Sequence, residues 1–252
     1  LERTEGDFKT SIPEFRLHDL IVEALADVWG RWHDAMAADP SVPIRRRPSK
    51  AEYTRRITEF LHEYRGFAGK NMRSGGLYLN NTISLFAVAA YFNPETVVDS
   101  GTFTGNSAWA LSCACPDATI HSFDITHVAL RHRVPRVTYH LGDWAGIMCS
   151  PFPGTSTLGF FDDHVDQVQR LEECAVRNVR CLVFDDDTPV NATHTGHNTK
   201  SFPKVSFVFS RALQDVSSLR WRRRGKDFDV AIDHDRLRAA ESRIGDDSRL
   251  AD

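Results

Sequence analysis

Hydrophobic residues near the start of the chain recur at helical spacing. Over residues 13–38 apolar side chains return every three or four positions, which predicts one long amphipathic helix with a single buried stripe. Ser49 and Glu52 form a capping-box pattern, so a second helix is expected to begin there and to end at Gly66. The apolar run 83–92 predicts a third helix, which an Asn-Pro pair terminates.

Beyond the third helix the pattern changes to short apolar runs separated by helical stretches, as in a mostly parallel sheet covered on both faces. The expected parallel strands span residues 96–100, 119–124, 137–141, 157–161 and 179–184. Runs of alternating polarity on either side of Gly225 and Lys226 predict an antiparallel hairpin that closes this sheet. The chain is thus predicted to be α/β, with a helical region over 1–79, a sheet domain over 80–240 and a charged tail over 241–252.

The composition and net charge of the chain limit the kinds of molecule that it is expected to bind. The chain has 252 residues, 41% of them hydrophobic, which suffices for one substantial core. Its formal charge of -3 gives no overall electrostatic basis for binding nucleic acid or an anionic membrane, and no apolar segment approaches the ~20 residues that span a bilayer. Because the polar N-terminus has no signal-peptide pattern, we expect a cytoplasmic protein. Its expected partner is a small-molecule substrate, and the sequence is compatible with a monomer or a homo-oligomer. The five cysteines lack paired zinc spacing and are expected to be buried free thiols.

A glycine turn follows the first predicted parallel strand. Gly101 and Gly105 lie four positions apart, where backbone can approach a ligand and the following helix offers its free N–H groups. Asp124 ends the next strand, and a carboxylate about 20 residues beyond such a turn binds the ribose diol in nucleotide-binding folds. A tight strand-to-helix turn also needs glycine when nothing binds. The dinucleotide pattern G-x-G-x-x-G is absent, which disfavours NAD(P) as the ligand.

The residues around this turn carry a family resemblance. The segment DSGTFTGNSA, residues 99–108, resembles the acidic-x-Gly-x-x-x-Gly motif of class I S-adenosylmethionine-dependent methyltransferases, particularly their catechol O-methyltransferase-like branch. Asp124 is similar to that family's ribose-binding acid, and Gly142 with Asp143 resembles its adenine-edge position. The resemblance covers residues 80–187 and implies a Rossmann-like fold with a seven-stranded sheet. The cofactor-binding residues that it implies are Asp99, Gly101, Thr102, Gly105, Ser107, Asp124 and Asp143.

Acidic residues gather at the ends of the fourth and fifth predicted strands. Asp162 and Asp163 follow the fourth, and residues 185–187 are three aspartates that follow the fifth. Such carboxylates would repel one another at neighbouring strand ends unless protons, basic partners or a cation compensate them, and hard oxygen ligands suit Mg²⁺, Mn²⁺ or Ca²⁺. By resemblance, the metal ligands would be Asp163, or Asp162 in its place, together with Asp185 and Asp186, and the ion would be Mg²⁺ or Mn²⁺. An aspartate after a strand also often caps the next helix, so one of the first two is expected to do only that.

The sequence departs from the family at the catalytic base. Where the family has Asp-His-x-Lys, residues 163–166 read Asp-His-Val-Asp, so the lysine is missing. His164 or Asp166 would then take its role. His164 could equally serve as a hydrogen-bonding neighbour of the site.

These observations together predict methyl transfer from S-adenosylmethionine to a small polar acceptor, with a divalent ion that positions the acceptor and lowers its pKa. Three alternatives remain: cyclisation or elimination of the aminobutyryl arm of S-adenosylmethionine, NAD(P)-dependent oxidation or reduction, and a catalytically silent binding module. The glycine-rich segment 69–76 is expected either to close over the pocket as a lid or to act only as a tether.

Overall fold

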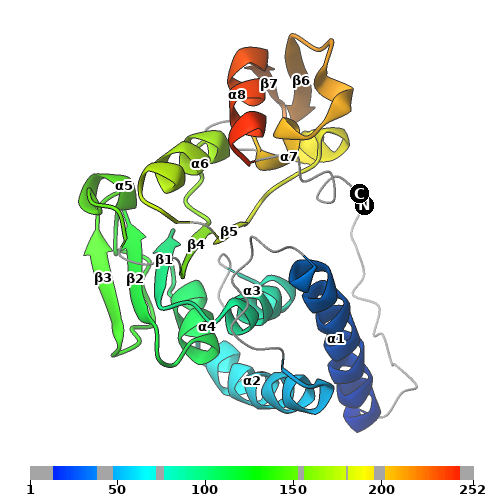
Figure 1. The fold of residues 1–252 in the computed structure, drawn as a ribbon, viewed down its shortest axis with the longest axis vertical. Helices are drawn as coiled ribbons and strands as arrows, with labels where there is room; N and C mark the ends of the chain where they lie inside the picture. The colour runs from blue at the N-terminus through cyan, green and yellow to red at the C-terminus, as the bar shows by residue number, and fades with distance from the viewer. Residues whose placement is uncertain are drawn as a thin grey trace. The chain divides into compact units, whose positions relative to one another are not determined.

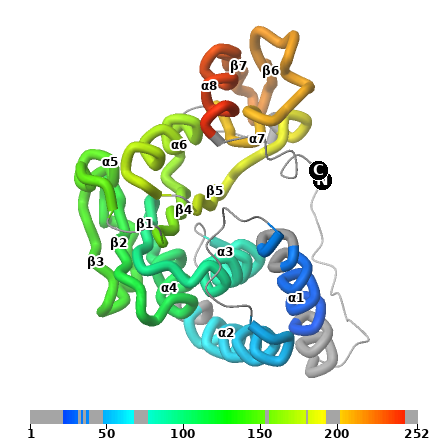
Figure 2. The backbone as a smooth tube through the Cα atoms, viewed as in Figure 1, coloured from blue at the N-terminus to red at the C-terminus, as the bar shows by residue number. Residues whose placement is uncertain are grey.

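The computed structural model describes residues 14–38, 48–71, 77–152, 156–179, 181–195 and 202–244, which Figures 1 and 2 draw. The chain divides into two compact units, Leu1–Arg73 and Ser74–Asp252. None of the described helices is both long enough and apolar enough to cross a membrane.

The first unit contains two of the predicted helices, α1 (Glu14–Ala37) and α2 (Lys50–Asn71). The predicted cap of α2 is confirmed, since the backbone N–H of Glu52 donates to Ser49 Oγ at 3.2 Å. The predicted end at Gly66 is wrong, because the helix continues to Asn71. A glycine inside a helix costs about 1 kcal/mol relative to alanine, and the burial of Tyr64 and Phe67 on either side offsets that cost. Residues 72–76 of the expected lid lie outside the described residues.

The second unit is built on a five-stranded sheet in which every neighbouring pair is parallel, with the order β3-β2-β1-β4-β5. Its strands are β1 (Thr96–Ser100), β2 (Thr119–Asp124), β3 (Val137–Leu141), β4 (Thr157–Phe161) and β5 (Cys181–Phe184). The predicted parallel strands are therefore confirmed, and β5 begins at Cys181 instead of 179. Because β1 lies between β2 and β4, the order reverses there, and ligands of such open sheets bind beyond the carboxyl end of the strands at this point.

Helices cover both faces of the sheet. They are α3 (Leu79–Phe92), α4 (Asn106–Ala114), α5 (Trp144–Ile147) and α6 (Gln167–Val176). The connections through α4 and α6 run toward opposite edges of the sheet, so right-handed crossovers place these two helices on opposite faces (Figure 1). On the α6 face, Val98, Phe123 and Phe161 pack with Trp144 and Cys174. The predicted end of α3 is confirmed, with a left-handed residue after Phe92.

The C-terminal part of the second unit packs around a second core, to which Val168 of α6 also contributes. Its elements are η1 (Val190–Thr195), α7 (Val205–Val208), η3 (Arg211–Leu213), β6 (Ser218–Arg223), β7 (Lys226–Ala231) and α8 (His234–Ile244). The antiparallel β6–β7 pair is confirmed, but it makes a separate two-stranded sheet instead of extending the parallel sheet to seven strands. The reason is packing: Trp221 lies against Phe202, with ring centroids 5.5 Å apart, in the core formed with α7 and α8.

All five cysteines are free thiols, as predicted. The expected burial holds for Cys115 and Cys174 but is wrong for Cys149, which is exposed.

Candidate active site

The turn between β1 and α4 depends on its two glycines. Gly101 has a φ of 104° and Gly105 a φ of 94°, both in the left-handed region. A Cβ atom on Gly101 would lie 2.4 Å from the carbonyl oxygen of Asp162, and one on Gly105 would lie 2.3 Å from that of His132. These close backbone approaches require glycine at both positions whether or not a ligand binds.

Several buried polar atoms in and beside this turn have no hydrogen-bond partner among the described residues. Asp99 is fully buried, and its Oδ2 accepts a hydrogen bond from Ser122 Oγ at 2.6 Å. Its Oδ1 has no hydrogen-bond partner among the described residues, and the same holds for the buried Thr104 Oγ1 and Asn106 Oδ1. Buried polar atoms are nearly always paired in folded proteins. Three unpaired oxygens, at the end of β1, in the turn and at the start of α4, therefore fit a ligand that brings hydrogen-bond donors.

Burial also determines the protonation of Asp99. The low-dielectric surroundings raise its pKa to about 6, and the hydroxyls of Ser122 and Ser107 partly offset this rise. Ser107 is buried in the first turn of α4, and the buried Thr102 hydroxyl shares a 2.6 Å hydrogen bond with Ser122 Oγ. A cationic ligand group at Oδ1 would stabilise the charged form of this carboxylate.

Asp124 joins the tip of β2 to the glycine turn. Its Oδ2 accepts from the backbone N–H of Phe103 at 2.8 Å, and its Oδ1 accepts from that of Thr126 at 3.1 Å. The carboxylate is thus fixed beside the turn, where the sequence predicted it, and its contact with ribose stays a prediction.

Asp143 is held by protein groups. Its Oδ1 accepts from the backbone N–H of Ala145 and caps α5, and its Oδ2 lies 2.5 Å from Nη2 of Arg170, a side chain that is only 1% exposed. These contacts fix the side chain as a cap and ion-pair partner, and its predicted contact with adenine stays a prediction.

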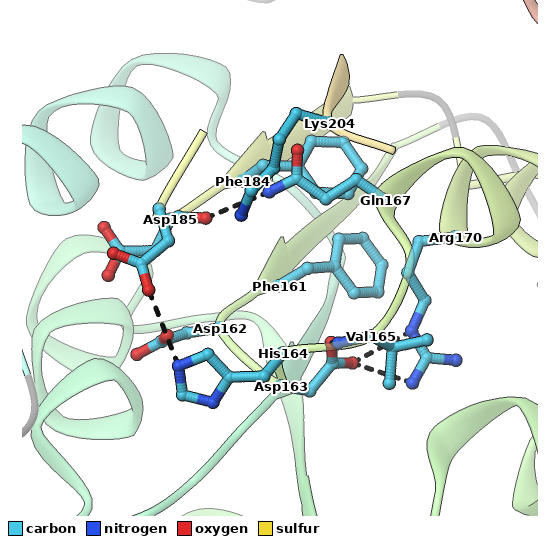
Figure 3. Close-up of a pocket in the computed structure, with 11 residues that line it drawn as sticks. Phe161, Asp162, Asp163, His164, Val165, Gln167, Arg170, Phe184, Asp185 and Lys204 are labelled. Carbon is cyan, nitrogen blue, oxygen red and sulfur yellow. Dashed lines mark hydrogen bonds and ion pairs between the residues drawn. The ribbon is translucent and has the colours of Figure 1, made fainter. Parts of the chain in front are cut away.

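Arg170 also binds Asp163, one of the two aspartates after β4 that were predicted as alternative metal ligands. Asp163 Oδ2 accepts from Arg170 Nε at 2.9 Å and from Ser100 Oγ at 2.5 Å, while its Oδ1 accepts from the backbone N–H of Val165. Figure 3 shows this carboxylate turned toward Arg170. These contacts disfavour Asp163 as a metal ligand, because the buried Arg170 binds its Oδ2 and a backbone N–H binds its Oδ1. Its predicted role as a ligand stays a prediction.

The neighbours of Asp163 point the other way and meet the tip of β5. Asp162, His164 and Asp186 each offer one ligand atom, and these atoms all lie within 4.8 Å of one another. His164 Nε2 is 3.5 Å from Asp186 Oδ2 (Figure 3), and both residues have a φ of 56°. Left-handed backbone is uncommon for residues other than glycine and often occurs at functional turns.

Asp185 belongs to the same pocket but is held separately. Its Oδ1 accepts from Nδ2 of Asn81, on the first turn of α3, at 2.8 Å. Of the predicted metal ligands, the structure therefore brings Asp186 into the close group and places Asp185 beside it. Asn81 was not found from the sequence, because nothing in its local pattern distinguishes it from a helix-surface asparagine.

Burial and mutual repulsion raise the pKa values of two carboxyl groups in this pocket. Burial raises the pKa of Asp162 to about 8, and the negative charge of Asp185 contributes to the rise. Burial and then the charge of Asp186 raise the pKa of Asp185, whereas the hydrogen bond to Asp186 raises the pKa of His164. A cation entering the pocket would therefore displace protons.

Both carboxylate oxygens of Asp166 are bonded to protein groups. Its Oδ1 accepts from the backbone N–H of Gln169 and caps α6, and its Oδ2 accepts from Arg236 Nη1 at 2.5 Å. These contacts disfavour Asp166 in the place of the missing lysine, and its predicted role as a base stays a prediction. The helix-capping role expected for Asp162 or Asp163 falls on Asp166 instead.

A lysine does reach the pocket from elsewhere in the chain. Lys204 lines it together with Asp162, His164 and Asp186, and is only 3% exposed. Burial lowers the pKa of its amino group, and the charge of Asp186 opposes this effect. Nothing in its local pattern marks Lys204 as a site residue, since it lies beyond both strand-end motifs, just before α7.

No family model matches the sequence, and no curated protein matches it. Among solved structures, a methyltransferase from Geobacter sulfurreducens is 15% identical, with 69% of this chain and 87% of that chain covered and a TM-score of 0.42. An O-methyltransferase from Bacillus cereus in complex with SAH is 14% identical, with coverages of 82% and 100% and a TM-score of 0.39. An apo-structure of CmcI is 12% identical, with a TM-score of 0.41. The aligned part covers 53% of this chain and 63% of CmcI, so this chain spans less than two thirds of that protein.

Proposed function

We propose that this protein is an S-adenosylmethionine-dependent methyltransferase that acts on a small polar acceptor. The observation that carries the proposal is the glycine turn, where the buried Asp99 has an unpaired Oδ1 and Asp124 stands at the adjacent strand end. This turn lies at the point where the strand order reverses.

The donor and acceptor groups of the turn fit S-adenosylmethionine. Asp99 would bind the cofactor's ammonium group, the free N–H groups at the start of α4 would face its carboxylate, and Asp124 would accept from the ribose hydroxyls. A pyrophosphate would instead place negative charge beside the buried Asp99, which disfavours NAD(P). The bound cofactor supplies an activated methyl group, and the task of the protein is to hold the acceptor in line with it.

The group formed by Asp162, His164 and Asp186 supports the acceptor end of the proposal. Two carboxylates and an imidazole suit a divalent ion such as Mn²⁺, and this mixed set favours it over Mg²⁺, which prefers oxygen ligands alone. An ion bound there would supply positive charge that lowers the pKa of an acceptor hydroxyl. His164 would serve as a ligand of the ion, so its lone pair would not be free to accept a proton at the same time.

The proposal is tested by mass spectrometry of a reaction mixture. The protein is incubated with S-adenosylmethionine, Mn²⁺ and a panel of small hydroxy, amino and carboxy compounds. We expect S-adenosylhomocysteine together with a product heavier by one methylene group. Formation of 5′-methylthioadenosine without any methylated product would contradict methyl transfer and indicate attack on the aminobutyryl arm.

A further inference from the structure

Lys204 adds a positive charge to a pocket whose strand-end motifs contain mainly acids. Its side chain is buried and lines the same pocket as Asp162, His164 and Asp186 (Figure 3). The residue comes from the segment before α7, and the two acidic turns come from the ends of β4 and β5. The fold, not the local sequence, therefore brings the charges of opposite sign together.

Hydrogen bonds on both sides of Lys204 fix its backbone to the acidic turns. The N–H of Gln167 donates to the carbonyl of Pro203 at 3.2 Å, and the N–H of Val205 donates to Gln167 Oε1 at 2.9 Å. The N–H of Ser206 donates to Asp187 Oδ1 at 3.2 Å. Gln167 also donates through Nε2 to the carbonyl of Asp185 at 3.1 Å. The position from which the lysine side chain extends is thus tied to the tip of β5.

Burial is the largest influence on the ammonium group and lowers its pKa. The negative charges of Asp186, Asp187, Asp185 and Asp162 oppose this effect, in decreasing order of strength. Taking an ammonium group out of water is costly unless opposite charges surround it. Two of the four carboxylates, those of Asp162 and Asp186, also belong to the group that would hold a divalent ion. An ion in that group would therefore be repelled by Lys204.

We propose that Lys204 is a resident cation that sets the affinity of the acidic pocket for divalent metal ions. Its charge offsets part of the negative charge of the aspartates, and it thereby weakens the binding of a second cation. The inference rests on the proposed function, because it assigns a role to a residue at the acceptor end of that site.

The test is a titration of the full chain with Mn²⁺, in which free Mn²⁺ is measured by electron paramagnetic resonance at constant ionic strength. Lys204→Met removes the charge and keeps the length of the side chain. We expect it to bind Mn²⁺ at least about tenfold more tightly than the wild-type protein, because Coulomb repulsion is strong at short range in a partly desolvated pocket. Lys226→Met, which removes an exposed lysine on β7, is the matched control and should leave the affinity unchanged.

Adding Asp162→Asn to Lys204→Met should abolish the gain, which locates the ion in the pocket. An unchanged or weaker affinity in Lys204→Met, an equal gain in Lys226→Met, or no Mn²⁺ binding by either protein would overturn the proposal. Circular dichroism checks that the variants are folded, and Lys204→Gln replaces the methionine variant if that one is not. Titration with S-adenosylhomocysteine separates the two proposals: a protein that gains Mn²⁺ affinity but binds no S-adenosylhomocysteine would support the role of Lys204 and contradict the methyltransferase.

Discussion

At the scale of single residues, Asp99 is a buried carboxyl group that lowers the stability of the fold at neutral pH. Its carboxyl has a pKa of about 6 in the folded protein because it is fully buried. An aspartate in an unfolded chain titrates near a pKa of about 3.9. Between these values the folded state binds the proton more strongly than the unfolded state does. The contribution of Asp99 to stability is therefore greatest at low pH and is lost as the pH rises toward 6.

Asp99→Asn should remove this penalty. We expect the free energy of unfolding at pH 7 to rise by about 1–3 kcal/mol, since each pKa unit corresponds to about 1.4 kcal/mol and the hydrogen bond from Ser122 can be kept. The difference between the two proteins should shrink as the pH falls from 6 to 4. Urea denaturation at several pH values measures both effects. A variant that is less stable than the wild type at pH 7 would show that the ionised carboxylate stabilises the fold.

The two aspartates after β4 give a matched pair for a second prediction. Asp163→Asn weakens the ion pair with the buried Arg170 and should lower the free energy of unfolding by about 1–3 kcal/mol. Asp162→Asn removes a carboxylate whose burial disfavours its charge, so it should be neutral or stabilising. In contrast, Mn²⁺ affinity should be lost in Asp162→Asn and kept in Asp163→Asn. A Mn²⁺ titration in which Asp163→Asn loses affinity and Asp162→Asn keeps it would identify Asp163 as the ligand.

At the scale of elements, the hydrophobic pattern predicted the strands well because each parallel strand is a short apolar run between polar turns. It could not predict that β6 and β7 form their own sheet, since this depends on the packing of Trp221 against Phe202. The end of α2 was missed for a similar reason. Local propensity favours a stop at Gly66, but tertiary burial of the neighbouring aromatic residues carries the helix onward.

Two glycines in different elements should respond oppositely to the same substitution. Gly105→Ala forces a Cβ against the carbonyl oxygen of His132 at a left-handed position, and we expect it to cost at least about 2 kcal/mol. Gly66→Ala meets no atom within 4 Å inside α2 and should stabilise the protein by about 0.5–1 kcal/mol. Thermal unfolding of both variants measures the contrast. A Gly105→Ala protein as stable as the wild type would mean that the turn can relax without its glycine.

At the scale of the whole molecule, topology decided which of the predicted site residues meet. The sequence placed the acidic residues at the correct strand ends, because parallel strands end at one edge of the sheet. It could not say that Asn81 and Lys204 enter the pocket, since these residues lie on other elements than the two acidic turns. Nor could it say that Arg170 holds Asp163 seven positions earlier, since this contact depends on how α6 packs against β4. Motifs thus located the site, while long-range packing selected the side chains within it.

Calorimetric titration of the protein with S-adenosylhomocysteine and, separately, with NAD tests the proposed cofactor site. We expect S-adenosylhomocysteine to bind more tightly than NAD, and Asp124→Ala to weaken its binding about ten- to a hundredfold, the loss expected for a charge-assisted hydrogen bond. Asp117→Ala, which removes an exposed aspartate in the turn after α4, should leave the affinity unchanged. Tighter binding of NAD, or an affinity for S-adenosylhomocysteine that is the same with and without the Asp124 carboxylate, would contradict the proposed cofactor site.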